Sequence, residues 1–183
     1  MSIVKLNNRG VKDATAFGSI TGLGDLVFIS RSTASSSASV SITSGINSTY
    51  KEYIFVFNNI HPEQDGKNFS FQASTDSGSS YGVTATTTNF VANHNEAGND
   101  TNFYYYAAHD LAQSTNYQII SDYTVNDNDA AASGILHIFE PSSTTFVKHF
   151  IARFTNYYKP TYSNSTFAAG YFNTTSALDA FDF

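Results

Sequence analysis

The chain has 183 residues, which suits a single domain, and it holds no cysteine, which excludes disulfides, thiolate-ligated metals and a thiol nucleophile. Its formal net charge of −6 argues against nucleic acid as a partner, because phosphate binding requires a basic surface. The sequence has no apolar run of about 20 residues and no signal-peptide pattern, so we expect a soluble protein with no membrane insertion, made in a cytoplasm.

Residues 1–24 show neither a helical nor a strand period and hold four glycines. We predict that they form an extended N-terminal docking arm, followed by one β-sandwich domain over residues 25–183. The candidate docking residues are Lys5, Arg9, Lys12 and Phe17. Two alternatives for the arm are an edge strand through Ala16–Ile20 and a flexible terminus.

From residue 25 onward, short runs rich in aromatic and β-branched residues recur roughly every 8–12 residues, with turn signals between them. The expected strands are Asp25–Ser30, Ser37–Thr43, Tyr50–Ile60, Phe69–Ala73, Tyr81–Val91, Thr101–Tyr106, one that begins at Gln118, Ser133–Phe139, Phe146–Phe154, Thr166–Phe172 and Ala177–Phe183. Tyr50–Ile60 is apolar on both faces, so we expect it inside the fold. The pattern predicts an all-β protein, an antiparallel β-sandwich of the jelly-roll type.

The last expected strand, Ala177–Phe183, places Phe181 and Phe183 in alternation and has no polar terminator. It indicates either a short docked strand or a chain that continues beyond Phe183.

Polar loops are expected at Ala92–Asp100 and Asn126–Asp129. Their carboxylate and amide oxygens are the ligands that Ca²⁺ prefers, but neither loop has the glycine-centred pattern that ends in Glu. The histidines show no ligand spacing; they are His61, His94, His109, His137 and His149. The sequence therefore predicts no metal and no cofactor.

No catalytic motif stands out. Gly-x-Ser-x-Gly is absent, and no spacing singles out a pair of carboxylates among the 15 acidic residues. We expect a protein that is not an enzyme.

Three consecutive tyrosines, Tyr104, Tyr105 and Tyr106, offer flat rings with polar tips. Such rings stack on sugars or fill protein interfaces, so these residues are candidate contacts with a glycan or a partner. The alternative is cross-strand packing.

Five segments carry a family resemblance. They are Thr43–Phe55, Asn59–Pro62, Ser133–Ser142, Thr145–Phe150 and Ala169–Thr175. Together they resemble an abundant, mostly uncharacterised family of virion structural proteins of tailed bacteriophages of marine bacteria. The resemblance runs from about residue 25 to the end, implies no catalytic residues, and implies a further strand after Asn173–Thr175.

The resemblance implies a non-enzymatic virion structural protein on the particle surface, either a capsid decoration (cement) protein or a head-fibre protein. Its expected partners are the major capsid protein or other virion proteins, and we expect a homo-oligomer, for which a trimer suits either virion role. The alternative is a tail-fibre or tail-tip protein that binds a glycan of the host surface. A polysaccharide depolymerase is a third hypothesis, because β-folds host that activity.

Overall fold

The computed structural model describes residues 26–159 and 161–183. The chain divides into an N-terminal unit that ends at Arg31 and a unit from Ser32 to Phe183. The predicted docking residues Lys5, Arg9, Lys12 and Phe17 lie outside the described residues, so their role stays a prediction.

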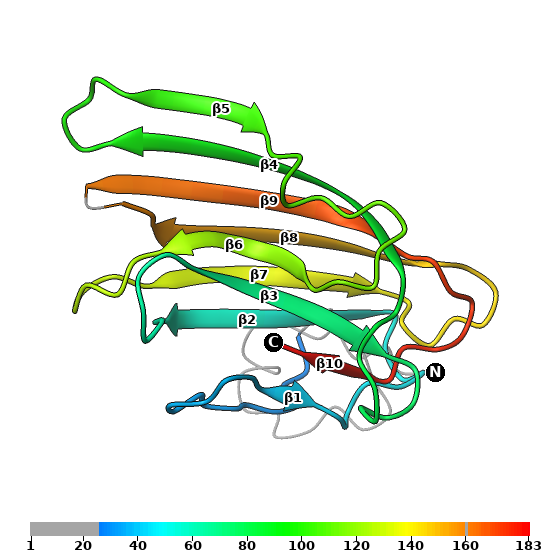
Figure 1. Cartoon of the computed structure of the whole chain (residues 1–183). Helices are drawn as coiled ribbons and strands as arrows, with labels where there is room; N and C mark the ends of the chain where they lie inside the picture. Colours follow the sequence, from blue (N-terminus) through cyan, green and yellow to red (C-terminus); the bar gives the residue numbers. More distant parts are fainter. Residues whose placement is uncertain (1–25, 160) are drawn as a thin grey trace, which may run out of the picture. The chain divides into compact units, whose positions relative to one another are not determined.

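The second unit is built from two antiparallel sheets, and the described residues contain no helix. The smaller sheet has the order β1 (Ser41–Ile42), β10 (Ala180–Asp182), β3 (Lys67–Ser74) and β6 (Gln118–Thr124) (Figure 1). The larger sheet has the order β2 (Glu52–Ile60), β7 (Ala132–Phe139), β8 (Lys148–Tyr157), β9 (Tyr162–Phe172), β4 (Ala85–Asn95) and β5 (Thr101–Tyr105). The predicted all-β class and antiparallel sandwich are confirmed, while the jelly-roll type stays a prediction. No helix among the described residues is long and apolar enough to cross a membrane.

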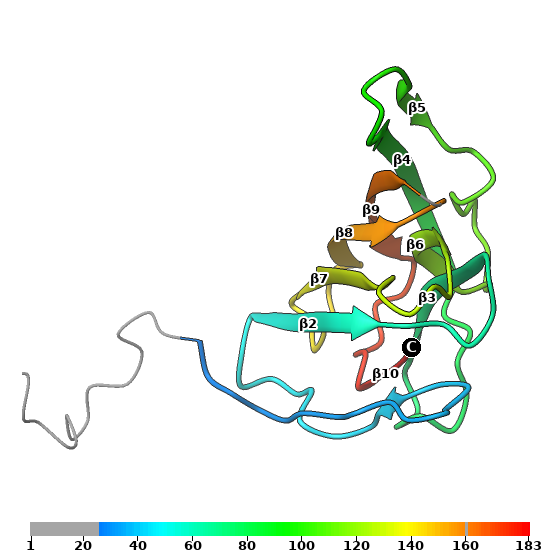
Figure 2. The same ribbon diagram turned by 90° about the vertical axis from the view of Figure 1, so that its left-hand side faces the viewer.

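The two sheets differ in width. Strand β6, at one edge of the smaller sheet, packs against β8 and β9 of the larger sheet. Figure 2 shows β4 and β5 continuing past β6, so the larger sheet extends beyond the smaller one at this edge. We call the face of the larger sheet that carries the buried core residues its inner face, and the opposite face its outer face.

Aromatic rings fill the space between the sheets around β3 and β10. Phe71 of β3 lies 5.1 Å from Phe150 of β8 between ring centroids, and Phe57 of β2 lies 4.9 Å from Phe183. These edge-to-face and tilted contacts are the favoured geometries of aromatic pairs. The rings that belong to or pack against this core are Phe55, Phe57, Phe69, Phe71, Phe150, Phe154, Phe172, Phe181 and Phe183.

The C-terminal segment is a docked strand. Strand β10 pairs with β1 on one side and β3 on the other, and Phe181 is fully buried. The short docked strand expected in Ala177–Phe183 is therefore observed, and the continuation of the chain beyond Phe183 stays a prediction.

Glycine completes the turns on both sides of β3. Gly66, which follows Asp65, and Gly78, which follows Ser77, have φ angles of 68° and 82°, which favour glycine. At the second turn, Asp76 accepts hydrogen bonds from the hydroxyls of Ser74 and Ser80, and these bonds lower the pKa of its carboxyl to about 2.

Four strand predictions are wrong in extent or position. The expected strand Ser37–Thr43 is reduced to the two residues of β1. Leu26–Ser30 forms no strand and is exposed, although most of its residues are apolar, because none of the described strands pairs with it. Strand β4 continues to Asn95 through part of the expected loop Ala92–Asp100, because β9 and β5 bond to both of its sides there. Strand β2 is an edge strand of the larger sheet, and its Val56 is 62% exposed on the outer face rather than inside.

Lys148 is a buried cation on β8. It has no exposed surface, its Nζ donates a hydrogen bond to the Thr174 carbonyl at 3.1 Å, and burial lowers its pKa. No ion pair found in the described part of the chain includes it. We expect Lys148→Met, which keeps the chain length and removes the charge, to raise the midpoint of thermal unfolding by about 2–4 °C, the equivalent of about 1 kcal/mol.

Circular dichroism at pH 7 measures that midpoint, with Lys51→Met as the control because Lys51 is on the surface. A lower midpoint for Lys148→Met alone would show that the bond to Thr174 outweighs the desolvation of the ammonium group.

Candidate ligand-binding surface

The three predicted contact tyrosines lie on two faces of the larger sheet, because consecutive residues of a strand point to opposite sides. Tyr104 pairs with the buried Val91 and lies on the inner face. Tyr105 pairs with Phe90, lies on the outer face with 55% of its surface exposed, and donates a hydrogen bond to Asp110. Tyr106 follows the strand, and its ring lies 5.5 Å from that of Tyr104. Of the three tyrosines, Tyr104 and Tyr106 therefore lie side by side. Their role as contact residues stays a prediction.

Three further tyrosines belong to the same region. Tyr158 lies 5.4 Å from Tyr123 of β6 and 6.4 Å from Tyr162 of β9 between ring centroids. Burial raises the pKa of Tyr104, and the charges of Tyr158 and Asp122 raise it further. We call this set the tyrosine cluster: Tyr104, Tyr106, Tyr123, Tyr158 and Tyr162.

A row of four asparagines crosses the larger sheet beside this cluster. Asn156 of β8 pairs with Asn164 of β9, Asn164 with Asn93 of β4, and Asn93 with Asn102 of β5. We call these four residues the asparagine ladder. The Asn164 amide donates to Asn156 Oδ1 at 3.0 Å, and the Asn102 amide donates to Asn93 Oδ1 at 3.2 Å. The ladder runs from the buried Asn164 and Asn156, through the half-buried Asn93, to the exposed Asn102.

Two rows of tyrosine flank the ladder on the same face. Residues two positions apart on a strand share a face, so Tyr104, two residues after Asn102 on β5, lies one row to one side of the ladder. Tyr162, two residues before Asn164 on β9, lies one row to the other side. The Tyr162 hydroxyl donates to Asp100 Oδ2 at 2.7 Å, and Asp100 Oδ1 accepts from the Asn102 amide at 2.8 Å. A carboxylate thus connects the ladder to the cluster.

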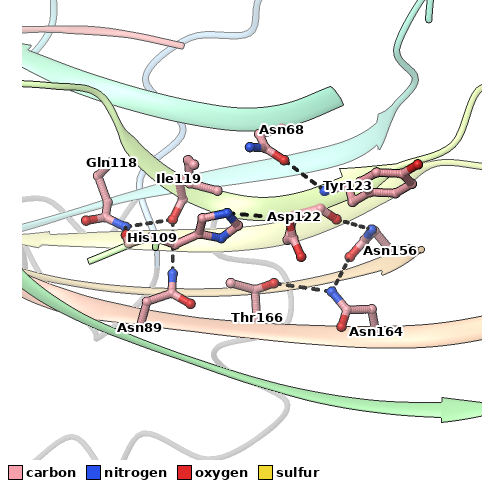
Figure 3. A network of polar contacts seen from close by, with 10 residues as sticks. All are labelled: Asn68, Asn89, His109, Gln118, Ile119, Asp122, Tyr123, Asn156, Asn164 and Thr166. Atoms are coloured by element: carbon pink, nitrogen blue, oxygen red, sulfur yellow. Dashed lines mark hydrogen bonds and ion pairs between the residues drawn. The ribbon is translucent and has the colours of Figure 1, made fainter. Parts of the chain in front are cut away.

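The interior below the ladder is polar, in contrast to the aromatic core. Asn156 Nδ2 donates to the Asp122 carbonyl at 2.6 Å, and Asn89 Nδ2 donates to the Ile119 carbonyl at 3.3 Å, so amides of the larger sheet bond to the backbone of β6 (Figure 3). His109 Nε2 lies 3.6 Å from Asp122 Oδ1, and both side chains are buried. Burial raises the pKa of Asp122 to about 6 and lowers the pKa of His109.

Several atoms of this interior are buried without a hydrogen-bond partner among the described residues. They are Asn89 Oδ1, His109 Nδ1, Gln118 Oε1, Ser121 Oγ, Thr124 Oγ1 and Asn164 Oδ1. Three of these are amide oxygens, which only accept hydrogen bonds. A buried polar atom without a partner costs free energy, so these atoms hold hydrogen-bonding capacity that the described residues leave unused.

Strand β6, which borders this polar interior, contains a strained backbone position at Tyr123. Tyr123 has a φ angle of 43°, which is rare for a bulky side chain, and its amide donates to Asn68 Oδ1 at 3.0 Å (Figure 3). The pairing of β6 with β3 shifts register between Lys67 and Phe69, which is opposite this residue. Such strained positions concentrate at functional sites, and here the strain turns an aromatic ring toward Tyr158.

The outer face of the larger sheet is a second candidate surface. One row in register crosses all six strands, and we call it the outer row: Val56, Ile135, Arg153, Phe167, Phe90 and Tyr105. Phe90 stacks on Phe167 at 4.8 Å, and the Arg153 guanidinium lies 5.0 Å from the Phe167 ring centroid. A depression of about 380 Å³ on this face is lined in part by His149, Ile151 and Tyr171.

The histidines and polar loops considered as metal ligands do not form a common site in the part of the chain that the structure describes. Among the residues described, no three His, Asp or Glu side chains gather as metal ligands. Asn126 instead donates hydrogen bonds to Asp65 Oδ1 and the Glu63 carbonyl, and Asn95 Oδ1 accepts from the amides of Asn99 and Asp100. These two polar loops are therefore stabilised by their own asparagines.

Sequence reasoning missed the asparagine ladder. Its members are far apart in the chain and meet only through the register of four strands. One available signal was polarity at inward positions, since Asn156 follows the buried Phe154 with the strand period of two.

Comparison with known proteins finds no matching family model, no matching curated protein and no matching solved structure. The phage-family resemblance of the sequence therefore stays a prediction, and function is argued from the two surfaces.

Proposed function

We propose that this chain is a non-enzymatic structural protein displayed on the surface of a phage particle, most simply as a capsid decoration or head-fibre protein. The observation that carries the proposal is a set of exposed apolar side chains on the outer face of the larger sheet. Antiparallel sandwich sheets ordinarily present a polar face to solvent. Here Val56, Ile135 and Ile151 are 62%, 38% and 52% exposed, which is typical of an assembly surface.

The outer face is the right size for a stable contact with another protein. Six strands about 4.8 Å apart and about nine residues long cover roughly 700–800 Å². A standard protein interface buries about 800 Å² on each partner. The face is therefore large enough to hold a subunit in an assembly.

Its charge favours a second copy of this chain as the occupant. The outward positions of the six strands carry two formal charges, Glu52 and Arg153, which are of opposite sign. The whole chain, in contrast, carries −6, so most of its acidic residues lie elsewhere. A face with no net charge can pack on its own copy without repulsion, which matches the expected homo-oligomer.

The family resemblance supports the virion context. All five of its segments include parts of β2, β7, β8 or β9, which are consecutive strands of the larger sheet. These strands supply four members of the outer row, of which Ile135 lies within a resemblance segment, so the resemblance follows the strands of the larger sheet rather than the outer row itself.

The assembly surface is tested by charge insertion. We expect the native chain to sediment as an oligomer, and Ile151→Glu to sediment as a monomer, because a buried carboxylate without a partner destabilises an apolar contact. Phe146→Glu is the matched control, since Phe146 is 71% exposed in the segment between β7 and β8. A native chain that is monomeric throughout the micromolar range would contradict the proposal.

The virion role is tested separately by quantitative mass spectrometry of purified particles. A copy number close to that of the major capsid protein supports capsid decoration, and a low copy number that matches tail proteins supports the tail. Absence of the chain from particles would overturn the virion role.

A second function, recognition of a host-surface glycan by a tail-fibre or tail-tip protein, is favoured by one observation. The tyrosine cluster and the asparagine ladder share the inner face where the larger sheet extends beyond β6. This surface is on the opposite side of the sheet from the assembly surface, so one chain can carry both.

A further inference from the structure

We propose that the inner face of the larger sheet, where β8, β9, β4 and β5 carry the asparagine ladder, binds a neutral saccharide. The inference names the site and ligand class of the second function above and rests on it, but it is independent of the assembly surface.

The asparagine ladder supplies paired hydrogen-bonding groups. Each amide offers an acceptor oxygen and two donor hydrogens, a combination that matches neighbouring hydroxyls of a sugar ring, which both donate and accept. Because Asn93 and Asn102 are bonded to one another, their amides are held in place before a ligand arrives. Asp100 adds a carboxylate next to Asn102.

The buried half of the ladder is next to the accessible half in the same row, because Asn164 pairs with Asn93. Asn164 is 1% exposed, and its Oδ1 has no hydrogen-bond partner among the described residues, although its amide nitrogen bonds to Asn156. Asn93, the next member of the row, is only half-buried. The buried acceptor therefore lies one strand away from Asn93, where the accessible part of the row begins.

The tyrosine cluster supplies apolar ring faces on both sides of these amides. Tyr104 and Tyr162 lie one row before and one row after the ladder and are half-buried, so each ring is fixed by packing but still reaches solvent. Sugar rings present C–H groups on one face and hydroxyls at their edges. An aromatic ring beside a planar amide matches both features.

The charges of the site favour a neutral sugar over an acidic one. Asp100 accepts hydrogen bonds from both Tyr162 and Asn102, whereas the basic residue beside the cluster, Lys159, has its Nζ 5.1 Å from the Tyr158 ring centroid. A uronic or sialic carboxylate beside Asn102 would meet repulsion from Asp100.

The decisive comparison uses two adjacent tyrosines on opposite faces of β5. The probes are immobilised neutral oligosaccharides of glucose, galactose and mannose, with uronic-acid oligosaccharides as the counter-probe. We expect the native chain to bind at least one neutral probe and to bind the uronic probes at least tenfold more weakly. Tyr104→Ala should weaken binding at least tenfold, whereas Tyr105→Ala should leave it within twofold.

Asn102→Ala guards against a folding artefact, because Asn102 is exposed and its loss should not disturb the fold. It should weaken binding at least fivefold with an unchanged midpoint of thermal unfolding. Any of three results would overturn the site: no binding to the neutral probes, equal loss in Tyr105→Ala, or preference for the uronic probes.

Failure of this site and failure of the virion role remain distinguishable. Saccharide binding by a chain that is absent from particles would overturn the virion role alone. Normal copy number in particles without any saccharide binding would overturn the site alone.

Discussion

Phe71→Ala is expected to lower the free energy of unfolding by about 4 kcal/mol, a large part of the 5–15 kcal/mol that holds a typical domain folded. Phe71 of the smaller sheet has no exposed surface. Its ring lies 5.1 Å from that of Phe150 and 5.9 Å from that of Phe172, both on the larger sheet. Truncation therefore removes contacts between the two sheets and leaves a cavity where they meet.

Urea denaturation at pH 7 measures this loss as a lower transition midpoint at an unchanged slope. Phe146→Ala is the matched control, because Phe146 is 71% exposed and its truncation should change stability by no more than about 0.5 kcal/mol. Similar losses in the two variants would contradict the placement of Phe71 between the sheets.

The strands that the sequence predicted best are those with period-two burial. In β8, Lys148, Phe150, Ala152, Phe154 and Asn156 alternate with exposed residues, and the aromatic members of this series identify the strand. The apolar segment Leu26–Ile29 shows why composition alone is not enough: a strand needs a neighbour to bond to, and no strand pairs with these residues. The converse holds for Asn93–Asn95, which look like a loop but bond to strands on both sides.

Only part of the candidate site could be predicted from the sequence, because the rest of it depends on how the strands pair. Tyr104 and Tyr106 could be selected by residue type, and the strand expected over Thr101–Tyr106 already implied that Tyr105 points the other way. The asparagine ladder could not be predicted, because it depends on the register between β8, β9, β4 and β5. Register is set by contacts along whole strands, which no local pattern in the sequence records.

Asp122→Asn is expected to stabilise the protein by about 2–3 kcal/mol at pH 7. Burial raises the pKa of this carboxyl from 3.8 to about 6, so above pH 6 the folded state holds a buried carboxylate that the unfolded state leaves in water. Each pKa unit corresponds to about 1.4 kcal/mol. An amide of the same shape removes the buried charge.

The sign of the pH dependence follows from which state holds the proton. Between pH 3.8 and about 6 the folded state keeps a proton on Asp122 that the unfolded state has lost, so this residue makes stability fall as pH rises. His109 acts in the opposite direction: its folded pKa is lowered, so the unfolded state gains a proton below about pH 6.5 and stability falls as pH falls. In the native chain the two effects oppose one another.

Without the Asp122 carboxyl, the effect of His109 on the pH dependence of stability should become measurable. We expect the stability advantage of Asp122→Asn to be near zero at pH 4 and to grow to its full value by pH 7. The Asp122→Asn variant, unlike the native chain, should lose stability steadily as the pH falls below 6.5. Urea denaturation at pH 4, 5, 6 and 7 measures both curves, with Asp127→Asn in the exposed loop as the control. A variant that is less stable than the native chain at pH 7 would show that the attraction between Asp122 and His109, 3.6 Å apart, outweighs the desolvation of the carboxylate.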